Sequence, residues 1–168
     1  YRTTDAGKTW QKLGLDSTER ISMIAIHPKN PSTVFVAAPG PLFHNSRNRG
    51  LYRTTDFGTT WNNVLPGDDR TGCTDVLMHP TKPAVMLASL WTFRRTPYSF
   101  SSGGPLGGIY RSTDGGTTWT NITAGISLTN SGITWVAVSS FDPQKVWVTL
   151  TGYSAGNKVY FSSNGGSS

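Results

Sequence analysis

The stretch YRSTDGGTTW, at residues 110–119, decides the fold, because the chain contains it more than once. Similar copies are YRTTDAGKTW at residues 1–10 and YRTTDFGTTW at residues 52–61, and a fourth copy, YFSSNGGSS, starts at Tyr160. Their first tyrosines lie 51, 58 and 50 residues apart. Self-similarity at a long period is typical of repeat proteins, in which each repeat is one supersecondary unit. This stretch, named the box below, therefore marks the unit of the fold.

Each repeat also contains a pair of short apolar runs joined by a turn with proline. In the first full repeat, residues 24–26 and 34–38 flank a turn that contains Pro28 and Pro31. A third run leads into the box and a fourth run starts at its tryptophan, and no segment shows helical periodicity. Four short antiparallel strands per repeat predict the blades of a β-propeller.

We therefore predict an all-β fold, a propeller segment of about three four-stranded antiparallel blades that forms an incomplete ring. The approximate boundaries are 1–20 for the end of one blade, 21–65 and 74–123 for two full blades, and 133–168 for an incomplete blade. Because the chain starts inside one box and ends inside another, we expect a fragment of a larger protein. Its outer blade faces would then be covered by missing blades or by another chain.

The composition argues against several classes of partner and site. No apolar run approaches the ~18 residues of a membrane span, so we expect no membrane-spanning segment. The formal charge of +6 comes from scattered residues, and Arg2, Arg53 and Arg111 occupy the same position in their boxes. We interpret these arginines as structural and expect no nucleic-acid partner. No metal-binding or phosphate-loop spacing is present, which predicts no metal site and no cofactor.

Three further residues could suggest chemistry that the sequence does not favour. His27 and His79 each precede a turn proline, one repeat apart, which is typical of a turn residue and too far apart for a shared metal. Cys73 has no second cysteine in this chain, and we expect it to be buried. Low cysteine with abundant Trp, Thr, Ser and Gly favours a bacterial protein that is secreted, periplasmic or at the cell surface.

The box residues have a structural explanation. The aspartate can accept backbone N–H bonds across a turn, the glycine can adopt a positive φ, and the tryptophan can bury a large apolar surface against the neighbouring sheet. In the fourth copy Asn164 keeps an acceptor oxygen but loses the charge, which a turn tolerates and a catalytic acid does not. We predict such structural roles for Asp5, Gly7, Trp10, Asp56, Gly58, Trp61, Asp114, Gly116, Trp119, Asn164 and Gly166.

The box resembles the Asp-box, or BNR, repeat of sialidases, xyloglucan-active hydrolases, sortilin-type receptor domains and photosystem assembly factors, all of which are β-propellers. Together with HPKNPSTVFVAA at residues 27–38 and LWTFRRTPYSF at residues 90–100, it looks most like bacterial sortilin-like (VPS10-type) and glycosyl-hydrolase-type BNR proteins. The resemblance implies an extracellular propeller that binds a protein or glycan ligand. The alternative that it implies is a glycoside hydrolase acting on a β-glucan or a xyloglucan-type polysaccharide, so enzymatic activity stays open.

Strand order separates two ends of each blade. In an up-and-down sheet, the box turn and the His-Pro turn fall at one end, and the remaining connections fall at the other. Those remaining connections are the longer ones, and function on repeat scaffolds concentrates in such variable loops. The longer loops span residues 39–49, 66–74, 92–107, 123–131 and 151–157.

The longer loops carry aromatic and polar residues that suit a sugar ligand. Aromatic rings stack on the C–H faces of sugars, while hydroxyl groups need paired donors and acceptors. The alternative for the aromatics, including Tyr153, is that they attach a loop to its own blade, and Arg94 and Arg95 could be ion-paired to a neighbouring blade. The candidate ligand-binding residues are Trp91, Arg94, Arg95, Tyr98, Phe100, Arg47, His44 and Arg70.

Three carboxylates are candidates for catalysis. Asp75 lies at the start of the innermost strand of its blade, near the expected mouth of the central channel, and Asp68 and Asp69 lie just before it. Glycoside hydrolysis needs two carboxylates, ~5–5.5 Å apart for retention or ~6.5–9.5 Å for inversion, and one of them can come from elsewhere in the ring. The alternative is that Asp75 caps a loop or pairs with Arg70.

Overall fold

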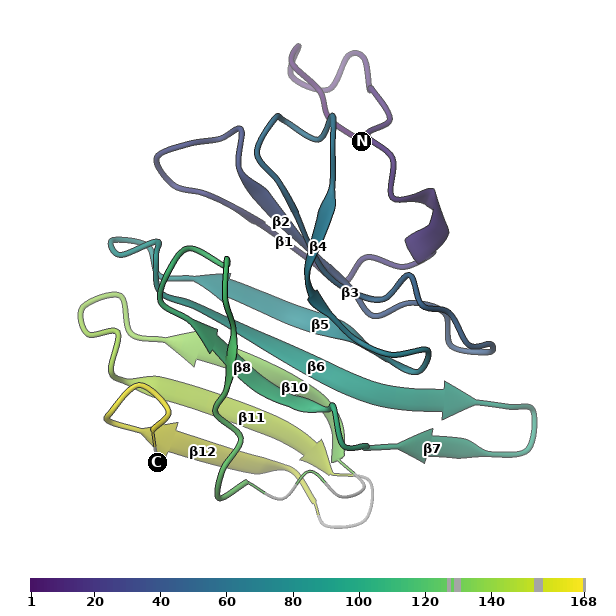
Figure 1. Ribbon diagram of the computed structural model, residues 1–168, viewed down its shortest axis with the longest axis vertical. Helices are drawn as coiled ribbons and strands as arrows, with labels where there is room; N and C mark the ends of the chain where they lie inside the picture. The colour runs from purple at the N-terminus through teal and green to yellow at the C-terminus, as the bar shows by residue number, and fades with distance from the viewer. Residues whose placement is uncertain (127, 129–130, 153–155, 168) are drawn as a thin grey trace.

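The computed structural model describes residues 1–126, 128, 131–152 and 156–167, and in this part of the chain the fold is all-β (Figure 1). Three antiparallel sheets follow one another along the chain. A single 3-10 turn, η1 (Asp16–Thr18), precedes the first of them. Tyr153, together with parts of the loops expected at 123–131 and 151–157, lies outside the described residues.

The first two sheets are meanders in which each strand pairs with its neighbours in sequence. The first consists of β1 (Met23–Ile26), β2 (Val34–Ala38), β3 (Gly50–Thr54) and β4 (Asn62–Pro66). The second consists of β5 (Thr71–Met78), β6 (Met86–Arg95), β8 (Gly108–Ser112) and β9 (Thr120–Asn121), and β7 (Phe100–Ser102) extends the end of β6 as a hairpin.

The third sheet contains β10 (Ser131–Val138), β11 (Val146–Gly152) and β12 (Lys158–Ser162). Ahead of the first sheet, residues 1–20 contribute an isolated antiparallel bridge between Arg2 and Gln11 on either side of the first box. The predicted propeller segment with four-stranded blades is therefore confirmed. One detail differs, because the loop expected at 92–107 contains the end of β6 and all of β7.

The core lies at the seams between sheets. One cluster of buried apolar side chains joins the first sheet to the second, with Phe35, Leu51, Val76 and Met86 among its members. The other joins the second sheet to the third and includes Ile109. Within a strand the inward residues alternate with outward ones, as in β11, whose burial alternates along Val146–Gly152. Each sheet is thus held by its neighbours, as expected for blades.

Each box forms a tight turn closed by its own side chains. In the second box, Asp56 accepts hydrogen bonds from Thr54 Oγ1 at 2.7 Å, from the Thr60 backbone N–H at 2.9 Å and from Thr60 Oγ1 at 2.7 Å. The bonds from Thr60 are the largest cause of the lowering of the pKa of Asp56 to about 2. The next two residues, Phe57 and Gly58, both have positive φ, 59° and 91°.

The arginine that follows the first tyrosine of a box links adjacent blades. Arg2 Nη1 donates to the carbonyl of Phe57 in the second box at 3.1 Å, and Arg111 Nη1 donates to the carbonyl of Gly165 in the fourth box at 3.0 Å. Arg53 reaches Thr117 Oγ1 of the third box at 3.4 Å. A box turn therefore closes its own hairpin and accepts the arginine of the preceding blade.

Candidate functional site

The two ends of the sheets differ in their connections (Figure 1). One end carries the box turns and the turns between the first two strands of each sheet. His79 closes one of these turns, because its Nδ1 accepts the backbone N–H of Lys82 at 3.0 Å, and His27 Nδ1 accepts that of Asn30 at the same distance. The opposite end, named the loop face below, carries the longer connections.

Hydrogen bonds join three connections of the loop face into one platform. The β2–β3 loop meets the β6–β7 hairpin where Arg95 N donates to the carbonyl of Leu42 at 3.0 Å. The same loop meets the β4–β5 connection where Ser46 N donates to the carbonyl of Asp69 at 2.9 Å. Phe93 N closes the triangle by donating to the carbonyl of Arg70 at 3.1 Å.

Arg49 lies beneath this platform with no exposed surface. Its guanidinium donates to the carbonyls of Pro39, Pro41 and His44, at 2.6 Å for Pro41 and 3.1 Å for His44. The guanidinium also lies over the Phe93 ring, 4.9 Å from its centroid, and burial lowers its pKa. Arg49 therefore fixes the shape of the β2–β3 loop. No local sequence pattern indicates this role, because the aromatic partner of Arg49 lies in another blade.

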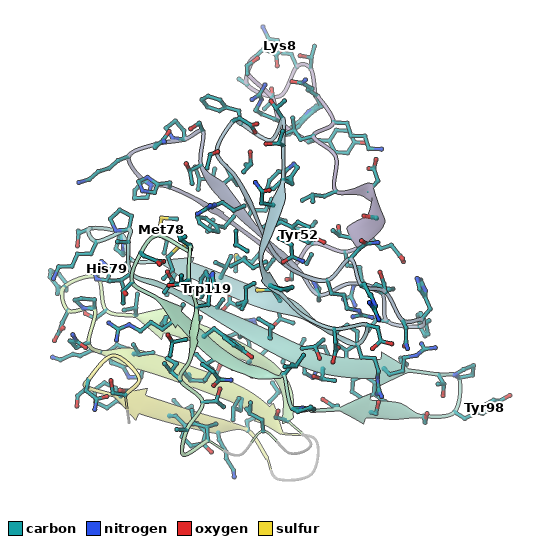
Figure 2. All side chains as sticks on the ribbon, viewed as in Figure 1. Lys8, Tyr52, Met78, His79, Tyr98 and Trp119 are labelled. Carbon is teal, nitrogen blue, oxygen red and sulfur yellow. The ribbon has the colours of Figure 1, made fainter. Side chains whose placement is uncertain are left out.

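Two of the three aromatic candidates pack into the platform. Trp91 is 8% exposed, donates from Nε1 to Ser102 Oγ at 2.8 Å, and stacks on Phe93 with 4.3 Å between ring centroids. Phe100 meets Trp91 edge-on at 5.9 Å. Tyr98 differs, because it lies at the tip of the β6–β7 hairpin with 98% of its surface exposed (Figure 2). Trp91 and Phe100 therefore support the surface that Tyr98 extends.

Within the described residues, the arginine candidates on the platform have no carboxylate partner. Arg47 and Arg95 are exposed, Arg94 Nη1 donates to the Arg95 carbonyl at 3.0 Å, and Arg70 Nη2 donates to Ser101 Oγ. The ion pairs found among the described residues are Lys12–Asp16 and His44–Glu19, each at 2.8 Å. His44 is thus engaged with Glu19, and the ion pair considered for Arg94 and Arg95 does not form within the described part of the chain.

Asp75 is buried between two blades. Its side chain is 5% exposed, and Oδ2 accepts the backbone N–H of Val136 in β10 at 3.0 Å. The register of β5 against β6 shifts between Cys73 and Asp75, and such bulges re-aim side chains. Burial raises the pKa of Asp75, and hydrogen bonds from the backbone of Val136 and Val76 oppose that shift. In this structure Asp75 joins the innermost strands of neighbouring blades.

Asp68 and Asp69 lie in the β4–β5 connection and stabilise it. Asp68 Oδ1 accepts the backbone N–H of Arg70 at 2.8 Å and of Thr71 at 2.6 Å, and Asp69 Oδ2 accepts Asn45 Nδ2 at 2.6 Å. Thr71 and Asp75 are four residues apart on β5, and Asp68 and Asp75 accept hydrogen bonds from different segments of the chain.

A hollow of about 490 Å³ lies beside the platform, between the β7–β8 connection and the segment after β9. Its walls include Ser102, Gly104, Asn121 and Thr123.

Cys73 is fully buried, and burial raises the pKa of its thiol. Among the residues that the structure describes, no three His, Cys, Asp or Glu side chains are grouped so that they could hold a metal ion.

One solved structure supports the fold. The solved structure of the Niastella koreensis GH74 enzyme matches 90% of this chain at a TM-score of 0.52 and 19% sequence identity. The GH74 xyloglucanase from Xanthomonas campestris matches 85% at a TM-score of 0.36 and 15% identity. The chain spans only 22% and 28% of those two proteins. A search of curated proteins found no match. No helix in the described residues is long and apolar enough to cross a membrane.

Two family models match the sequence itself. The model described as BNR/Asp-box repeat matches residues 110–121, which contain the third box. The model described as Sortilin, neurotensin receptor 3, matches residues 1–102, which contain the first two boxes and the Phe93–Phe100 hairpin of the loop face. Because that match covers more than half of the chain, this protein belongs to the Sortilin-Vps10 family of Asp-box propellers.

Proposed function

We propose that the loop face of this propeller segment binds a polysaccharide outside the cell. The observation that carries the proposal is the platform itself: three hydrogen-bonded connections that present Arg47, Arg70, Arg94 and Arg95 without carboxylate partners in the described residues. Guanidinium groups donate in a planar fork that suits paired oxygen acceptors. Tyr98 adds an exposed ring at the tip of the same hairpin, and a sugar face can stack on it.

The hollow beside the platform supports a chain-like ligand. It lies next to Ser102, which pairs with Phe93 across the hairpin and accepts the Trp91 indole N–H. A polysaccharide bound on the platform could extend one residue into this hollow, where glycines bring the backbone close to the ligand. The packed Trp91–Phe93–Phe100 group gives this surface a rigid base, which lowers the entropy lost on binding.

The charge distribution favours a polysaccharide that carries carboxylates. The acidic groups of this region already have partners: Asp68 accepts two backbone N–H groups, Asp69 accepts Asn45, and Glu19 pairs with His44. Arg70 and Arg94 donate to neutral oxygens, and Arg47 and Arg95 are exposed, so no carboxylate of the described residues pairs with these guanidinium groups. A uronic acid offers a planar carboxylate to such a guanidinium group at every charged residue of the polymer.

Binding is favoured over hydrolysis by the positions of the carboxylates. Asp75 is buried and bonded to Val136, and both Asp68 and Asp69 accept bonds that shape their loop. A general acid must reach the glycosidic oxygen, and a nucleophile must reach the anomeric carbon. Release of reducing sugar that is lost in Asp68→Asn and Asp69→Asn would support the hydrolase instead.

Calorimetric titration with polygalacturonate and with neutral xyloglucan tests the proposal. We expect polygalacturonate to bind, with affinity that falls as salt rises because exposed charges are screened. The double variant Arg47→Gln, Arg95→Gln should bind at least about tenfold more weakly, since each lost guanidinium removes a charge-assisted bond. The double variant Lys29→Gln, Lys82→Gln, an equal charge change in turns at the opposite end, should bind as the wild type does. No binding to either polymer would refute the function, and equal binding to both would refute the preference for carboxylates.

A further inference from the structure

The hollow beside the platform lies where the preceding blade has a buried side chain. The residue before β3 is Arg49, whose guanidinium lies under its own loop and donates to the carbonyls of Pro41 and His44. The residue before β8, at the same position of the next repeat, is Gly107, and it lines the hollow. Because Gly107 has no side chain, nothing from this position fills the space under the β7–β8 connection.

The same comparison leaves an amide group without the partner that its counterpart has. Asn63 and Asn121 occupy the same position in their repeats, each paired with the first tyrosine of its box. Asn63 Nδ2 donates to the Arg49 carbonyl at 2.9 Å. Asn121 Oδ1 accepts the backbone N–H of Thr123 at 2.8 Å, but its Nδ2 has no hydrogen-bond partner among the described residues. Asn121 therefore brings an available donor to the hollow that it lines.

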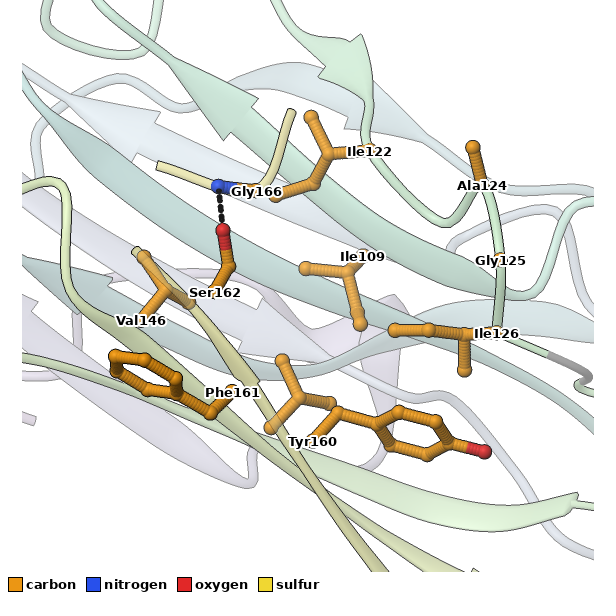
Figure 3. A pocket seen from close by; sticks show the side chains of 11 residues that line it. Ile109, Ile122, Ala124, Gly125, Ile126, Val146, Tyr160, Phe161, Ser162 and Gly166 are labelled. Carbon is orange, nitrogen blue, oxygen red and sulfur yellow. Dashed lines mark hydrogen bonds between the residues drawn. The ribbon is translucent and has the colours of Figure 1, made fainter. Parts of the chain in front are cut away.

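The segment after β9 forms a wall of the hollow that is fixed by the seam behind it. Ile122 and Ile126 pack on the apolar cluster between the second and third sheets, and Figure 3 shows their side chains in the crevice beside Ile109. Thr123 is tied to β8, because its Oγ1 accepts the Ile109 backbone N–H at 3.0 Å. Asn121 and Thr123 thus line the hollow while Ile122 lies in the seam. A ligand would meet a preformed surface, which lowers the entropy lost on binding.

The lining of the hollow suits an uncharged sugar residue. Neither the β7–β8 connection at 103–107 nor the segment 121–131 contains a charged residue. Apolar side chains can contact the C–H groups of a sugar, and polar ones can bond its hydroxyl groups. The apolar lining residues are Pro105, Ile126 and Leu128, and the polar ones are Ser102, Asn121 and Thr123. A carboxylate placed here would lose hydration without gaining a cationic partner, which is costly.

The hollow meets the arginine platform at the end of β7. Ser101 Oγ accepts a hydrogen bond from Arg70 Nη2, and the next residue, Ser102, lines the hollow. Consecutive Cα atoms are only about 3.8 Å apart. A polymer that places a carboxylate at Arg70 can therefore place a neighbouring sugar residue in the hollow.

We propose that the hollow binds an uncharged sugar residue, so that the ligand of the loop face is a heteropolysaccharide in which neutral residues adjoin uronic acids. This inference rests on the proposed binding of an acidic polysaccharide and adds which polymer is selected. A hydroxyl group of the neutral residue accepts Asn121 Nδ2, and its C–H groups contact Ile126 and Leu128. A polymer of uronic acid alone binds through the arginines and leaves the hollow unused.

Calorimetry with two oligosaccharides that carry the same three carboxylates tests this inference. One is trigalacturonate, and the other is a hexasaccharide in which galacturonic acid alternates with rhamnose. We expect the hexasaccharide to bind the wild type at least about tenfold more tightly. Gly107→Gln puts an uncharged side chain into the hollow, and should abolish this difference while trigalacturonate binds as before. A Cβ at Gly107 would lie 3.2 Å from the Gly104 carbonyl oxygen, so the turn must shift by a few tenths of an ångström.

Two further variants keep the test independent of that shift. Ala124→Gln adds the same side chain at an exposed position of the same segment, outside the lining of the hollow, and should keep the full difference. Asn121→Ala removes the available donor without filling the hollow. It should weaken binding of the hexasaccharide by about threefold or more, because one hydrogen bond is lost, and leave trigalacturonate unaffected.

The failure of this inference can be told from the failure of the proposed function. Equal affinity of the wild type for the two oligosaccharides would overturn the inference alone. So would a tenfold difference that persists in both Gly107→Gln and Asn121→Ala, because the gain would then come from another part of the surface. If neither oligosaccharide bound, the proposed function would fail, and the inference would fail with it.

Discussion

Asp75→Asn is the substitution that best separates a structural role from a catalytic one. The Asp75 carboxylate is 5% exposed and accepts backbone N–H groups, that of Val136 at 3.0 Å and that of its neighbour Val76. Asparagine has nearly the same shape but only one acceptor oxygen, and its amide group is a donor. One of the two buried N–H groups would then face another donor and lose its partner.

The expected cost follows from that lost bond. A buried donor left without an acceptor costs about 1–3 kcal/mol. For a chain of this size, each kcal/mol lowers the midpoint of thermal unfolding by about 2–4 °C, so the variant should melt roughly 2–12 °C lower.

The difference in stability between wild type and variant also depends on pH, with a definite sign. Burial raises the pKa of Asp75 above its ordinary value of 3.8, so the wild type gains stability relative to the variant as pH falls through the raised pKa, and the gain is complete below 3.8.

Thermal unfolding followed by circular dichroism, with hydrogen exchange at the Val136 amide, measures both parts of this prediction. Exchange at Val136 should be faster in the variant, because its acceptor is weakened. Asp16→Asn serves as the control, since Asp16 pairs with Lys12 on the exposed surface and should shift the midpoint little. An unchanged midpoint with an unchanged Val136 amide would refute the structural role, and loss of glycoside hydrolysis in that same folded variant would restore the catalytic assignment.

Three further predictions concern the boxes. Gly116→Ala should lower the melting midpoint more than Gly115→Ala does. Both glycines have positive φ, but a Cβ at Gly116 would lie 2.6 Å from the Phe35 ring, whereas a Cβ at Gly115 would meet nothing within 4 Å. Equal shifts in the two variants would contradict this contact between blades. Arg111→Met should destabilise the third sheet selectively, by removing the bond to the Gly165 carbonyl, seen as faster exchange in β12 than in β3. Hydrogen bonds from the box threonines lower the pKa of Asp5 and of Asp56 from 3.8 to about 2. These two aspartates therefore contribute stability above pH 3.8 that is lost as pH falls toward 2. The midpoint of thermal unfolding, measured at a series of acid pH values, should drop across that range.

The fold could be predicted because local signals repeat. A single YRSTDGGTTW could belong to many proteins, but its spacing of about 50 residues with two apolar runs between copies leaves few architectures. Turn chemistry is local, so the bonds of Asp56 to Thr54 and Thr60 follow from residues within four positions. The blade boundaries at 21–65, 74–123 and 133–168 stay a prediction.

The candidate site was less predictable because it depends on contacts between blades. Asp75 was expected at the channel mouth from its place at a strand start, but the bulge after Cys73 and the Val136 N–H of another sheet decide where the carboxylate points. The burial of Arg49 depends on Phe93, which lies 44 residues later in the chain. The sequence contains both residues, yet nothing in their local pattern pairs them.

The use of arginine at the two ends of the blades supports the proposal that a ligand binds on the loop face. At the box end, Arg2 and Arg111 each donate to a turn carbonyl of the next blade, and the box carboxylates are saturated by their own threonines. Those polar groups hold the seams, and a ligand that competed for them would weaken the fold. At the loop end, Arg49 holds the β2–β3 loop from a buried position, whereas Arg47 and Arg95 are exposed. Changes there can alter ligand preference without opening a seam, whereas the same changes in a box would separate two blades.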